Sequence, residues 1–215
     1  MIPVNTSGVY NIFTNDYDQW FEKHPNLYQS ELLAVKQAVP VQGVGIEIGV
    51  GTGRSTQPLN IKYSVESSDS MAQIVKERGV KISTAVAENL PIENQSYDFV
   101  IMVNTVCFLS GIPKAFSKVL RILKPRGEFV IGLLDRHSEL GIAYEQQKRT
   151  NKFYKDAHFH STQEITGLLT NAGFHSFTYW QTLTNPTDKD TAQPIPGFGS
   201  GFFIYSNESS KTSTP

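Results

Sequence analysis

Residues 47–53 read EIGVGTG, and they continue a short apolar run at residues 44–48. An apolar run that ends in glycines is typical of a buried strand. Glycine is needed where the backbone approaches a ligand closely or where φ is positive. In open α/β sheets, ligands lie beyond the carboxyl ends of the strands at the point where the strand order reverses. We therefore expect this loop to hold a ligand and to open a helix.

The segments around the loop alternate between strand and helix patterns. Strands are expected at residues 44–48, 61–65, 80–87, 97–103 and 128–134, and helices at residues 71–78 and 113–123. Strands that alternate with helices across short turns predict parallel βαβ units. Right-handed crossovers then place helices on both faces. The central part of the chain is therefore expected to form a doubly wound α/β sheet.

The two ends of the chain have different patterns. Residues 1–10 look irregular, and residues 14–38 predict one or two amphipathic helices interrupted at Pro25. Further helices are expected at 138–151 and 162–171, and paired strands at 174–183 and 201–205. Proline and glycine at 184–200 predict a long loop, and 207–215 a disordered tail. We expect one domain over residues 1–206, with an N-terminal helical cap (1–40) and a candidate lid (136–160).

Composition narrows the class of protein. A length of 215 residues suits one domain, and the net charge of −1 disfavours general nucleic-acid binding without excluding a local basic patch. Cys107 is the single cysteine, so no internal disulfide can form, which fits a reducing compartment. The sequence has no signal-peptide pattern and no run approaching the roughly 18 apolar residues that cross a bilayer. We expect a cytoplasmic protein with no membrane partner.

An acidic residue follows the second expected strand. Glu66 ends the run IKYSVE, where a carboxylate can accept hydrogen bonds from two ribose hydroxyls. Glu66 lies 13 residues after Gly53, fewer than the roughly 20 of a dinucleotide fingerprint. Arg54 occupies the small third position of that fingerprint, and the Gly-Lys-Ser/Thr ending of a P-loop is absent. These features count against a bound dinucleotide or nucleoside triphosphate.

Four motifs, in register, resemble the class I S-adenosylmethionine-dependent methyltransferases, particularly the small-molecule, "type 11"-like group. They are EIGVGTG at 47–53, the acid Glu66, AENLP at 87–91 followed by YDFV at 97–100, and LKPRGE at 123–128 before the fifth strand. The resemblance implies a Rossmann-like methyltransferase fold, with a mostly parallel seven-stranded sheet and an antiparallel C-terminal strand. It also implies S-adenosylmethionine as the cofactor.

The resemblance carries a set of site residues with it. It implies that Glu47 or its neighbours hold the methionine amino group of the cofactor and that Glu66 binds its ribose. The expected cofactor-binding residues are Glu47, Gly49, Val50, Gly51, Gly53, Glu66, Ser67, Ala87, Glu88, Asn104 and Thr105; Ala87 and Glu88 would border the adenine, and Asn104 and Thr105 the methionine side. Two positions depart from the family pattern. Val86 replaces a common acid, leaving adenine contacts to Glu88 and the backbone, and Arg126 replaces a glycine in a turn that should tolerate it.

The catalytic residues are less clear from the sequence. His158 and His160 could act as a general base with a pKa near neutral, although packing of this aromatic segment on the core is the favoured interpretation. Tyr17 is a third catalytic candidate, and with Trp20 and Tyr28 it would either form a lid over the substrate or pack a helix onto the sheet. No metal site is expected.

The expected function is transfer of a methyl group from S-adenosylmethionine to a small molecule. In-line displacement gains mainly from alignment, worth up to about 7–11 kcal/mol. Residues 103–106 read VNTV, which argues against the amino methyltransferases of adenine or glutamine and against cytosine C5 methylation. Two alternatives are an NAD-dependent oxidoreductase and a catalytically inactive S-adenosylmethionine-binding module. A monomer and a homodimer are equally compatible with the sequence.

Overall fold

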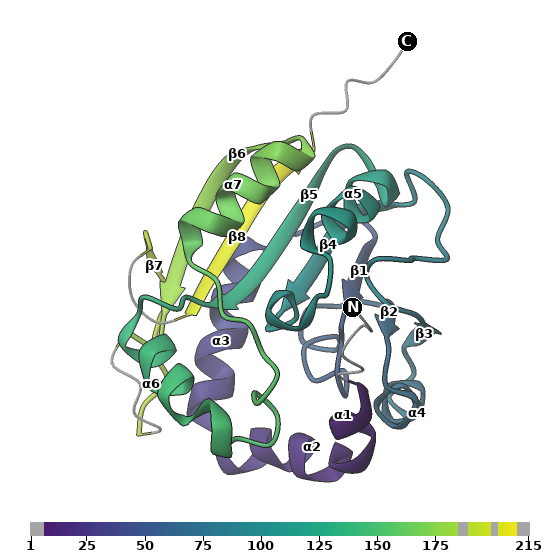
Figure 1. Cartoon of the computed structure of the whole chain (residues 1–215). Coiled ribbons are helices and arrows are strands. Elements are labelled where there is room, and N and C mark those ends of the chain that lie inside the picture. Colours follow the sequence, from purple (N-terminus) through teal and green to yellow (C-terminus); the bar gives the residue numbers. More distant parts are fainter. Residues whose placement is uncertain (1–6, 185–188, 199–201, 210–215) are drawn as a thin grey trace.

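The computed structural model describes residues 7–184, 189–198 and 202–209, and its centre is one sheet of eight strands (Figure 1). The strand order is β3-β2-β1-β4-β5-β8-β6-β7. The strands are β1 (Gly45–Ile48), β2 (Tyr63–Glu66), β3 (Lys81–Thr84), β4 (Tyr97–Val103), β5 (Leu123–Leu134), β6 (Phe174–Thr182), β7 (Ile195–Pro196) and β8 (Phe202–Ser209). Strands β1 to β5 pair in parallel, whereas β8 is antiparallel to both β5 and β6.

This topology confirms the doubly wound, mostly parallel α/β fold with an antiparallel C-terminal strand. The expected count of seven strands is too low by one. The short strand β7 pairs with β6 inside the segment that was expected to be a loop. The chain also crosses from β1 to the far edge and back to β4, so the strand order reverses between β1 and β4. The expected ligand position lies beyond the carboxyl ends of these two strands.

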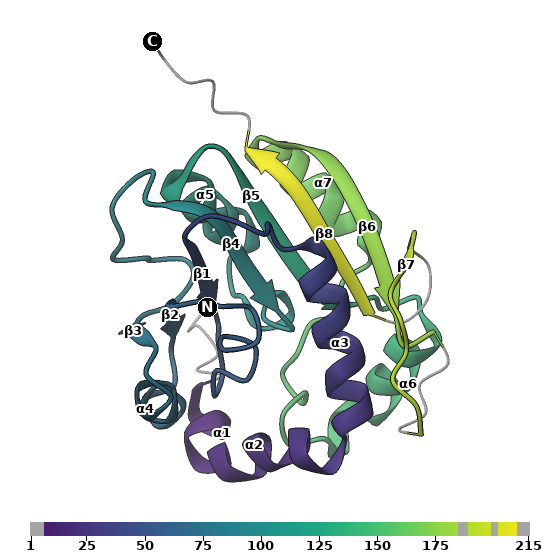
Figure 2. The ribbon, with the colours of Figure 1, turned by 180° about the vertical axis from the view of Figure 1, so that it is seen from behind.

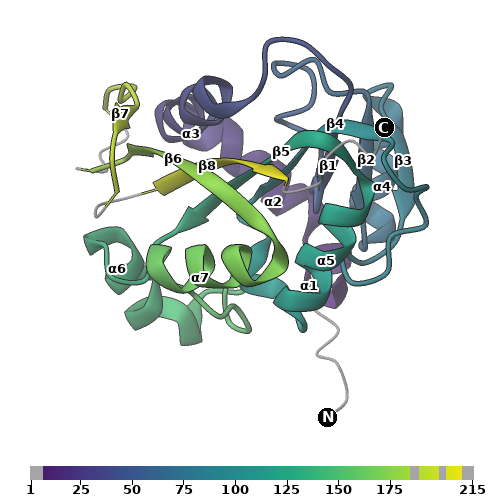
Figure 3. The same cartoon turned by 90° about the horizontal axis from the view of Figure 1, so that it is seen from above.

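The alternation of side chains along β4 assigns helices to both faces of the sheet. Val100 and Met102 belong to the core cluster shared with α5 (Ile112–Ile122) and α7 (Thr162–Ala172). Phe99 and Ile101 belong to the cluster shared with α3 (Pro25–Ala38). Figure 3 shows α3 on one side of the sheet and α5 and α7 on the other. A central strand buried on both faces explains why its sequence is almost continuously apolar.

Residues 7–38 form three helices, of which the second and third match the two helices expected on either side of Pro25. Helix α1 (Ser7–Ile12) begins within the residues that looked irregular, so that expectation was wrong. Helix α2 (Thr14–Lys23) ends before Pro25, which occupies the first turn of α3, where a missing N–H costs nothing. Helices α1 and α2 lie across the end of the sheet to which β1 and β4 point (Figures 1 and 2).

The glycine loop does not open a helix, which corrects the sequence expectation. Residues 51–60 form a series of turns before β2. Gly49, Gly51 and Gly53 have φ angles of 72°, 58° and 82°, so alternate residues adopt the left-handed conformation and the chain cannot start a right-handed helix there. Helix α4 (Asp69–Glu77) follows β2 instead, and the Ser68 side chain caps its first turn.

The C-terminal third largely follows the expected order. Helix α6 (Glu139–Gln147) continues into the 3₁₀ turn η2 (Lys148–Thr150), and α7 has a capping box at Ser161 and ends at Gly173 in the left-handed conformation. Strand β8 runs to Ser209, so residues 207–209 are strand rather than tail, and residues 210–215 lie outside the described residues. None of the helices in the described ranges is long and apolar enough to span a membrane.

Candidate active site

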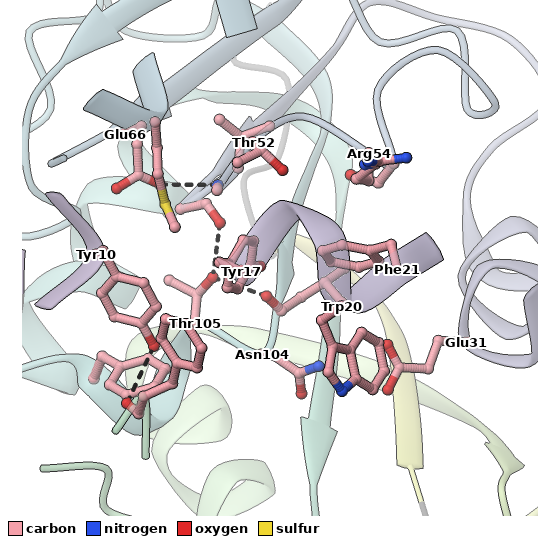
Figure 4. A pocket seen from close by; sticks show the side chains of 18 of the residues that line it. Tyr10, Tyr17, Trp20, Phe21, Glu31, Thr52, Arg54, Glu66, Asn104 and Thr105 are labelled. Atoms are coloured by element: carbon pink, nitrogen blue, oxygen red, sulfur yellow. Dashed lines mark hydrogen bonds between the residues drawn. The ribbon is translucent and has the colours of Figure 1, made fainter. Parts of the chain in front are cut away.

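A cavity of about 250 Å³ lies beyond the carboxyl ends of β1, β2 and β4. Its floor comes from the glycine loop, the end of β2 and the residues after β4. Its roof comes from α1, α2 and the segment after η2. The lining residues include Tyr10, Tyr17, Trp20, Phe21, Tyr28, Glu31, Glu47, Gly49, Gly51, Arg54, Ser55, Glu66, Ser67, Asn104, Thr105, Phe108, Tyr144, Phe153 and Tyr154. Figure 4 shows Glu66, Tyr17 and Glu31 among the side chains around the cavity.

Glu66 joins the end of β2 to the glycine loop. Its Oε2 accepts a hydrogen bond from the Gly51 N–H at 2.9 Å, and its Oε1 accepts from the backbone N–H groups of Ser67 at 2.8 Å and Ser68 at 2.9 Å. Burial raises the pKa of this carboxyl, and these hydrogen bonds oppose the shift because they stabilise the ionised form. The Gly51 N–H is the one described donor to Oε2, so a lone pair of Oε2 can accept from a ligand hydroxyl.

Glu47 is the second carboxyl in the cavity wall. It is 2% exposed at the end of β1, where Ser55 Oγ donates a hydrogen bond to Oε2 at 2.5 Å. Burial, together with repulsion from Glu66, raises the pKa of Glu47 to about 8, against the opposing effect of the Ser55 hydroxyl. An acid with this pKa is largely protonated at neutral pH and ionises when a cation binds beside it.

The glycines of the loop are required by neighbouring side chains as well as by φ. A Cβ on Gly49 would lie 2.5 Å from Thr105 Oγ1, and a Cβ on Gly51 would lie 2.9 Å from the Tyr17 hydroxyl. The loop backbone therefore lies closer to Thr105 in the floor and to Tyr17 in the roof than a residue with a side chain would allow. The Gly49 N–H and Val50 N–H both donate to the Val65 carbonyl, at 2.8 and 3.2 Å, which fixes the loop against β2.

The residues after β4 form the other end of the floor. Asn104 has φ of 51°, and its N–H donates to the Gly132 carbonyl at 2.9 Å, so the chain turns sharply at the cavity. Glu31 of α3 and Asn104 both line the cavity. Burial raises the pKa of Glu31 to about 7, and the neighbouring Asn104 side chain opposes the shift. A third carboxyl thus faces the cavity, in the region of Asn104.

Aromatic rings from three distant parts of the chain form the roof. Tyr10 of α1 stacks on Phe153 after η2, with ring centroids 5.7 Å apart, and contacts Phe108 edge-on at 5.6 Å. Tyr17 of α2 contacts Phe153 at 5.8 Å and Phe21 at 5.4 Å. Burial keeps the Tyr10 and Tyr17 hydroxyls protonated by raising their pKa. The roof therefore brings together the expected N-terminal cap and part of the expected lid.

Ion pairs attach α2 to the glycine-loop side. Arg54 Nη2 lies 2.6 Å from Asp18 Oδ2, and Arg54 Nη1 lies 2.5 Å from Glu22 Oε1. Arg78 also contacts Asp18, at 2.9 Å. Arg54 is the one cationic side chain among the described cavity-lining residues, and its charge is directed to these two acids. Arg54, the bulky residue that interrupts a dinucleotide fingerprint, thus anchors α2 beside the glycine loop.

The structure brings eight of the eleven sequence-predicted cofactor residues to the cavity. They are Glu47, Gly49, Val50, Gly51, Glu66, Ser67, Asn104 and Thr105. The other three lie elsewhere. Gly53 packs near Val75 of α4 and Ala87 lies in the core. Glu88 accepts hydrogen bonds from the Ser110 N–H at 2.9 Å and the Gly111 N–H at 3.1 Å, so it holds the start of α5.

Of the three catalytic candidates, one lines the cavity and two do not. Tyr17 lines the cavity. His158 is exposed, and its N–H donates to the Cys107 carbonyl at 2.7 Å. His160 faces Glu164 at 3.8 Å, burial lowers its pKa, and it borders a separate small pocket behind Asn104. Neither histidine therefore contributes to the described cavity wall.

Sequence reasoning missed part of the wall. Arg54 and Glu31 were not expected there, and nor were Tyr10, Phe21, Phe108, Tyr144, Phe153 and Tyr154. The abundance of aromatic residues at 10–28 and 153–154 was a visible signal, because aromatics far apart in the chain often meet over a site. Glu31 gave no signal, because an acid on an amphipathic helix usually faces solvent.

The donor set fits S-adenosylmethionine. The ligand carries a sulfonium, an ammonium group and a ribose diol, and the cavity offers Glu66 near the glycine loop and two further carboxyls, Glu31 and Glu47. The pyrophosphate of a dinucleotide fits poorly, since turns replace the helix whose N-terminus would bind it and the carboxylates would repel it. The described residues hold no group of three or more His, Cys, Asp or Glu that could bind a metal.

Comparisons with known proteins agree with this chemistry. Residues 46–131 match the family model described as "Methyltransferase domain". A crystal structure of a Thermotoga maritima protein, described as a SAM-dependent methyltransferase and possible histamine N-methyltransferase, is 41% identical with a TM-score of 0.91, covering 94% of this chain and 98% of that one. An uncharacterized Methanocaldococcus jannaschii protein is 40% identical over 92% of this chain and 96% of its own length. A Geobacter sulfurreducens malonyl-[acyl-carrier protein] O-methyltransferase is 24% identical over 61% of this chain and 55% of its own.

Proposed function

Because the chain belongs to the class I S-adenosylmethionine-dependent methyltransferases, we propose that it methylates a small organic molecule enclosed beneath α1 and α2. Methyl transfer from S-adenosylmethionine is the activity of the family. The small-molecule acceptor is what the proposal adds to the family activity. The observation that carries it is the position of the cavity: the aromatic roof covers the space in which an acceptor must meet the methyl group.

The cofactor-binding roles are part of the same proposal. Glu66 would accept hydrogen bonds from the ribose hydroxyls, and the Gly49–Gly51 backbone would pack against the nucleoside. Glu47 would pair with the methionine ammonium group, since a buried carboxyl of raised pKa gains most from a neighbouring positive charge. Thr105, whose hydroxyl faces the Val103 carbonyl at 3.0 Å, would border the methionine side.

A small acceptor follows from the architecture of the roof. Rings from α1, α2 and the segment after η2 meet over the cavity, and the pairs of Arg54 and Arg78 with Asp18 hold the cap on the sheet. A folded macromolecule could reach the methyl group only after this cap had moved away. A small molecule needs only a transient opening, and aromatic walls suit an apolar body with a few polar groups.

Catalysis in this site would rest on alignment. The sulfonium supplies an already activated methyl group when bound. The residues of this chain would hold the two reactants in line, close the roof against water and stabilise the positive charge with carboxylates. Alignment of this kind is worth up to about 7–11 kcal/mol. His158 and His160 are not part of the proposal, because neither lines the described cavity.

Two measurements test the proposal. Calorimetry should show tight binding of S-adenosylhomocysteine and none of NAD, and Glu66→Ala should abolish the binding, while Glu88→Gln outside the cavity should retain it. The purified protein with methyl-labelled S-adenosylmethionine should then label at least one member of a panel of small amines, phenols, thiols and carboxylates. Labelling of proteins or nucleic acids with no small molecule labelled would refute the small-molecule acceptor.

A further inference from the structure

Glu31 lies in the cavity without a role in the cofactor-binding proposal. It projects from α3, and Figure 4 shows its carboxyl near the Trp20 indole and Asn104, on the opposite side of the view from Glu66. Glu31 and Asn104 line the same cavity, and Asn104 comes directly after β4, so the carboxyl lies at the end of that strand. This end is the one that the family resemblance assigns to the methionine side, next to the reacting sulfur. Glu31 is thus placed where an acceptor would approach.

The surroundings of Glu31 favour a positively charged ligand. Arg54 is the one cation among the described lining residues, and it binds Asp18 and Glu22. The cavity wall therefore presents the Glu31 carboxyl without a basic side chain to neutralise it. An ionised carboxylate in a half-buried site gains stability from a bound cation, because water no longer screens the interaction fully.

Trp20 adds a second preference for a cation. Its ring lines the cavity from α2, held edge-on by Phe21 at 5.3 Å and in contact with His24 at 5.0 Å. An indole face attracts an ammonium group within about 6 Å of the ring, because the face of the π-system carries partial negative charge. A carboxylate beside an indole therefore selects an ammonium group over a hydroxyl or a carboxylate of similar size.

We propose that the methyl acceptor is a small amine whose ammonium group binds between Glu31 and Trp20, and that the Glu31 carboxylate removes a proton from it before transfer. The proposal rests on the proposed function above and names its substrate class. Only an amine that has lost this proton has the lone pair needed for displacement.

The step balances without any further reactant. The acceptor ammonium R–NH₃⁺ gives one proton to Glu31, and the freed lone pair on nitrogen forms a bond to the methyl carbon. The carbon–sulfur bond breaks and its electron pair stays on sulfur. The products are R–NH₂–CH₃⁺, S-adenosylhomocysteine and a protonated Glu31, which then releases its proton to solvent.

The protonation behaviour of Glu31 supports this role. Burial raises its pKa to about 7, which makes it a stronger proton acceptor than an exposed glutamate. The titratable groups that interact with it are Tyr17 from α2 and Tyr144 from α6, and both hydroxyls have raised pKa values and stay neutral at physiological pH. Glu47 lines the same cavity from β1. Because kcat/KM reports the ionisation of Glu31 before the amine binds, kcat/KM for the amine should rise with pH through about 7 and then level off.

An experiment must distinguish this role of Glu31 from one rival role. Glu31 could bind the methionine ammonium group of the cofactor, as proposed for Glu47. In that case Glu31→Gln would weaken S-adenosylhomocysteine binding. As an acceptor-binding base, Glu31 should leave the affinity for S-adenosylhomocysteine unchanged within about twofold, and its loss should affect only the amine.

The test uses the full chain saturated with S-adenosylhomocysteine. All variants carry Trp180→Phe, so that Trp20 is the only tryptophan left in the sequence and reports the fluorescence change. Histamine, 2-phenylethylamine and putrescine are the amine probes, and 2-phenylethanol and 3-phenylpropanoate are the neutral and anionic controls. We expect at least one amine to quench Trp20 and to accept labelled methyl from S-adenosylmethionine. Glu31→Gln should weaken the binding of that amine at least tenfold. Glu77→Gln, on the exposed surface of α4, should leave the binding unchanged.

The outcomes separate the two proposals. Equal quenching by 2-phenylethanol, no quenching by any amine, or loss of S-adenosylhomocysteine binding in Glu31→Gln would each overturn the amine proposal while the methyltransferase assignment stands. Failure of the unmodified chain to bind S-adenosylhomocysteine would instead overturn the proposed function. Circular dichroism confirms folding, and Glu31→Asp provides a second variant, which should retain amine binding and lose rate because its carboxylate is one carbon shorter.

Discussion

The protonation state of Glu47 predicts a marked pH dependence of cofactor binding. The experiment compares the affinity for S-adenosylhomocysteine at about pH 6 and at about pH 8. The ammonium group of this ligand should pair with the Glu47 carboxylate. Burial raises the pKa of Glu47 to about 8, so the carboxyl is mostly protonated at pH 6 before ligand binds. Binding then requires loss of one proton, which costs more free energy the further the pH lies below the pKa.

The size of the effect follows from the fraction of ionised Glu47. With a pKa of about 8, roughly 1% of the carboxyl is ionised at pH 6 and half at pH 8. The affinity should therefore be about 50-fold higher at pH 8, equivalent to about 2.3 kcal/mol. In the absence of ligand the sign is opposite: the raised pKa stabilises the fold below the unfolded-state pKa, and this contribution is lost as the pH rises through about 8.

Isothermal titration calorimetry in buffers of different ionisation enthalpy measures both the affinity and the protons released. We expect close to one proton released per ligand at pH 6 and a smaller number at pH 8. Glu47→Gln is the control. At pH 8 this variant should bind S-adenosylhomocysteine more weakly than the unmodified protein does, and its binding should no longer release the proton that comes from Glu47. An affinity that is flat from pH 6 to 8 in the unmodified protein, or higher at pH 6, would show that Glu47 does not pair with the ligand.

Three further substitutions test individual parts of the structure. Gly51→Ala places a Cβ 2.9 Å from the Tyr17 hydroxyl at a φ of 58° and should lower stability by about 1–3 kcal/mol in chemical denaturation, and adding Tyr17→Phe should restore part of it; no recovery would show that Tyr17 is not the obstacle. Asp18→Asn removes the ion pair with Arg54 and should speed dissociation of S-adenosylhomocysteine severalfold in stopped-flow measurements, whereas an unchanged rate would mean that the cap is held by its aromatic contacts. Arg126→Gly relieves a φ of 62° at an exposed position in the irregular first part of β5 and should raise the melting temperature by a few degrees, and a fall would show that this position is not strained.

The sequence predicted the sheet well because its physical signals are local and strong. Strand β4 was predicted with the observed bounds, since a central strand is apolar along its whole length. The capping box at Ser161 and the left-handed Gly173 are short-range signals, and α7 was predicted to within one residue. The eighth strand could not be foreseen, because β7 has two residues and forms only by pairing with β6.

The glycine loop shows where local reasoning failed. A strand followed by glycines usually leads into a helix, but three left-handed glycines in alternate positions direct the chain into turns. The loop nevertheless lies beside Glu66, because parallel strands end at the same edge of the sheet. The positions of Ala87 and Glu88 depended on how the chain after β3 packs, which the residues alone did not determine.

The roof of the cavity depended on contacts between distant segments. Tyr10 and Phe153 stack although 143 residues separate them in the chain, and no local pattern encodes such a pair. Glu31 was missed because its helix, α3, packs on the sheet by one face while Glu31 lines the cavity. The floor of the site was therefore predictable from motifs, and the part that would choose the acceptor was not.

A crystal structure of the protein with S-adenosylhomocysteine tests the central claim most directly. We expect both ribose hydroxyls within hydrogen-bonding distance of the Glu66 carboxylate and the sulfur directed toward the end of the cavity that holds Glu31 and Asn104. A nucleoside bound outside this cavity, or a ribose that makes no contact with Glu66, would contradict the account.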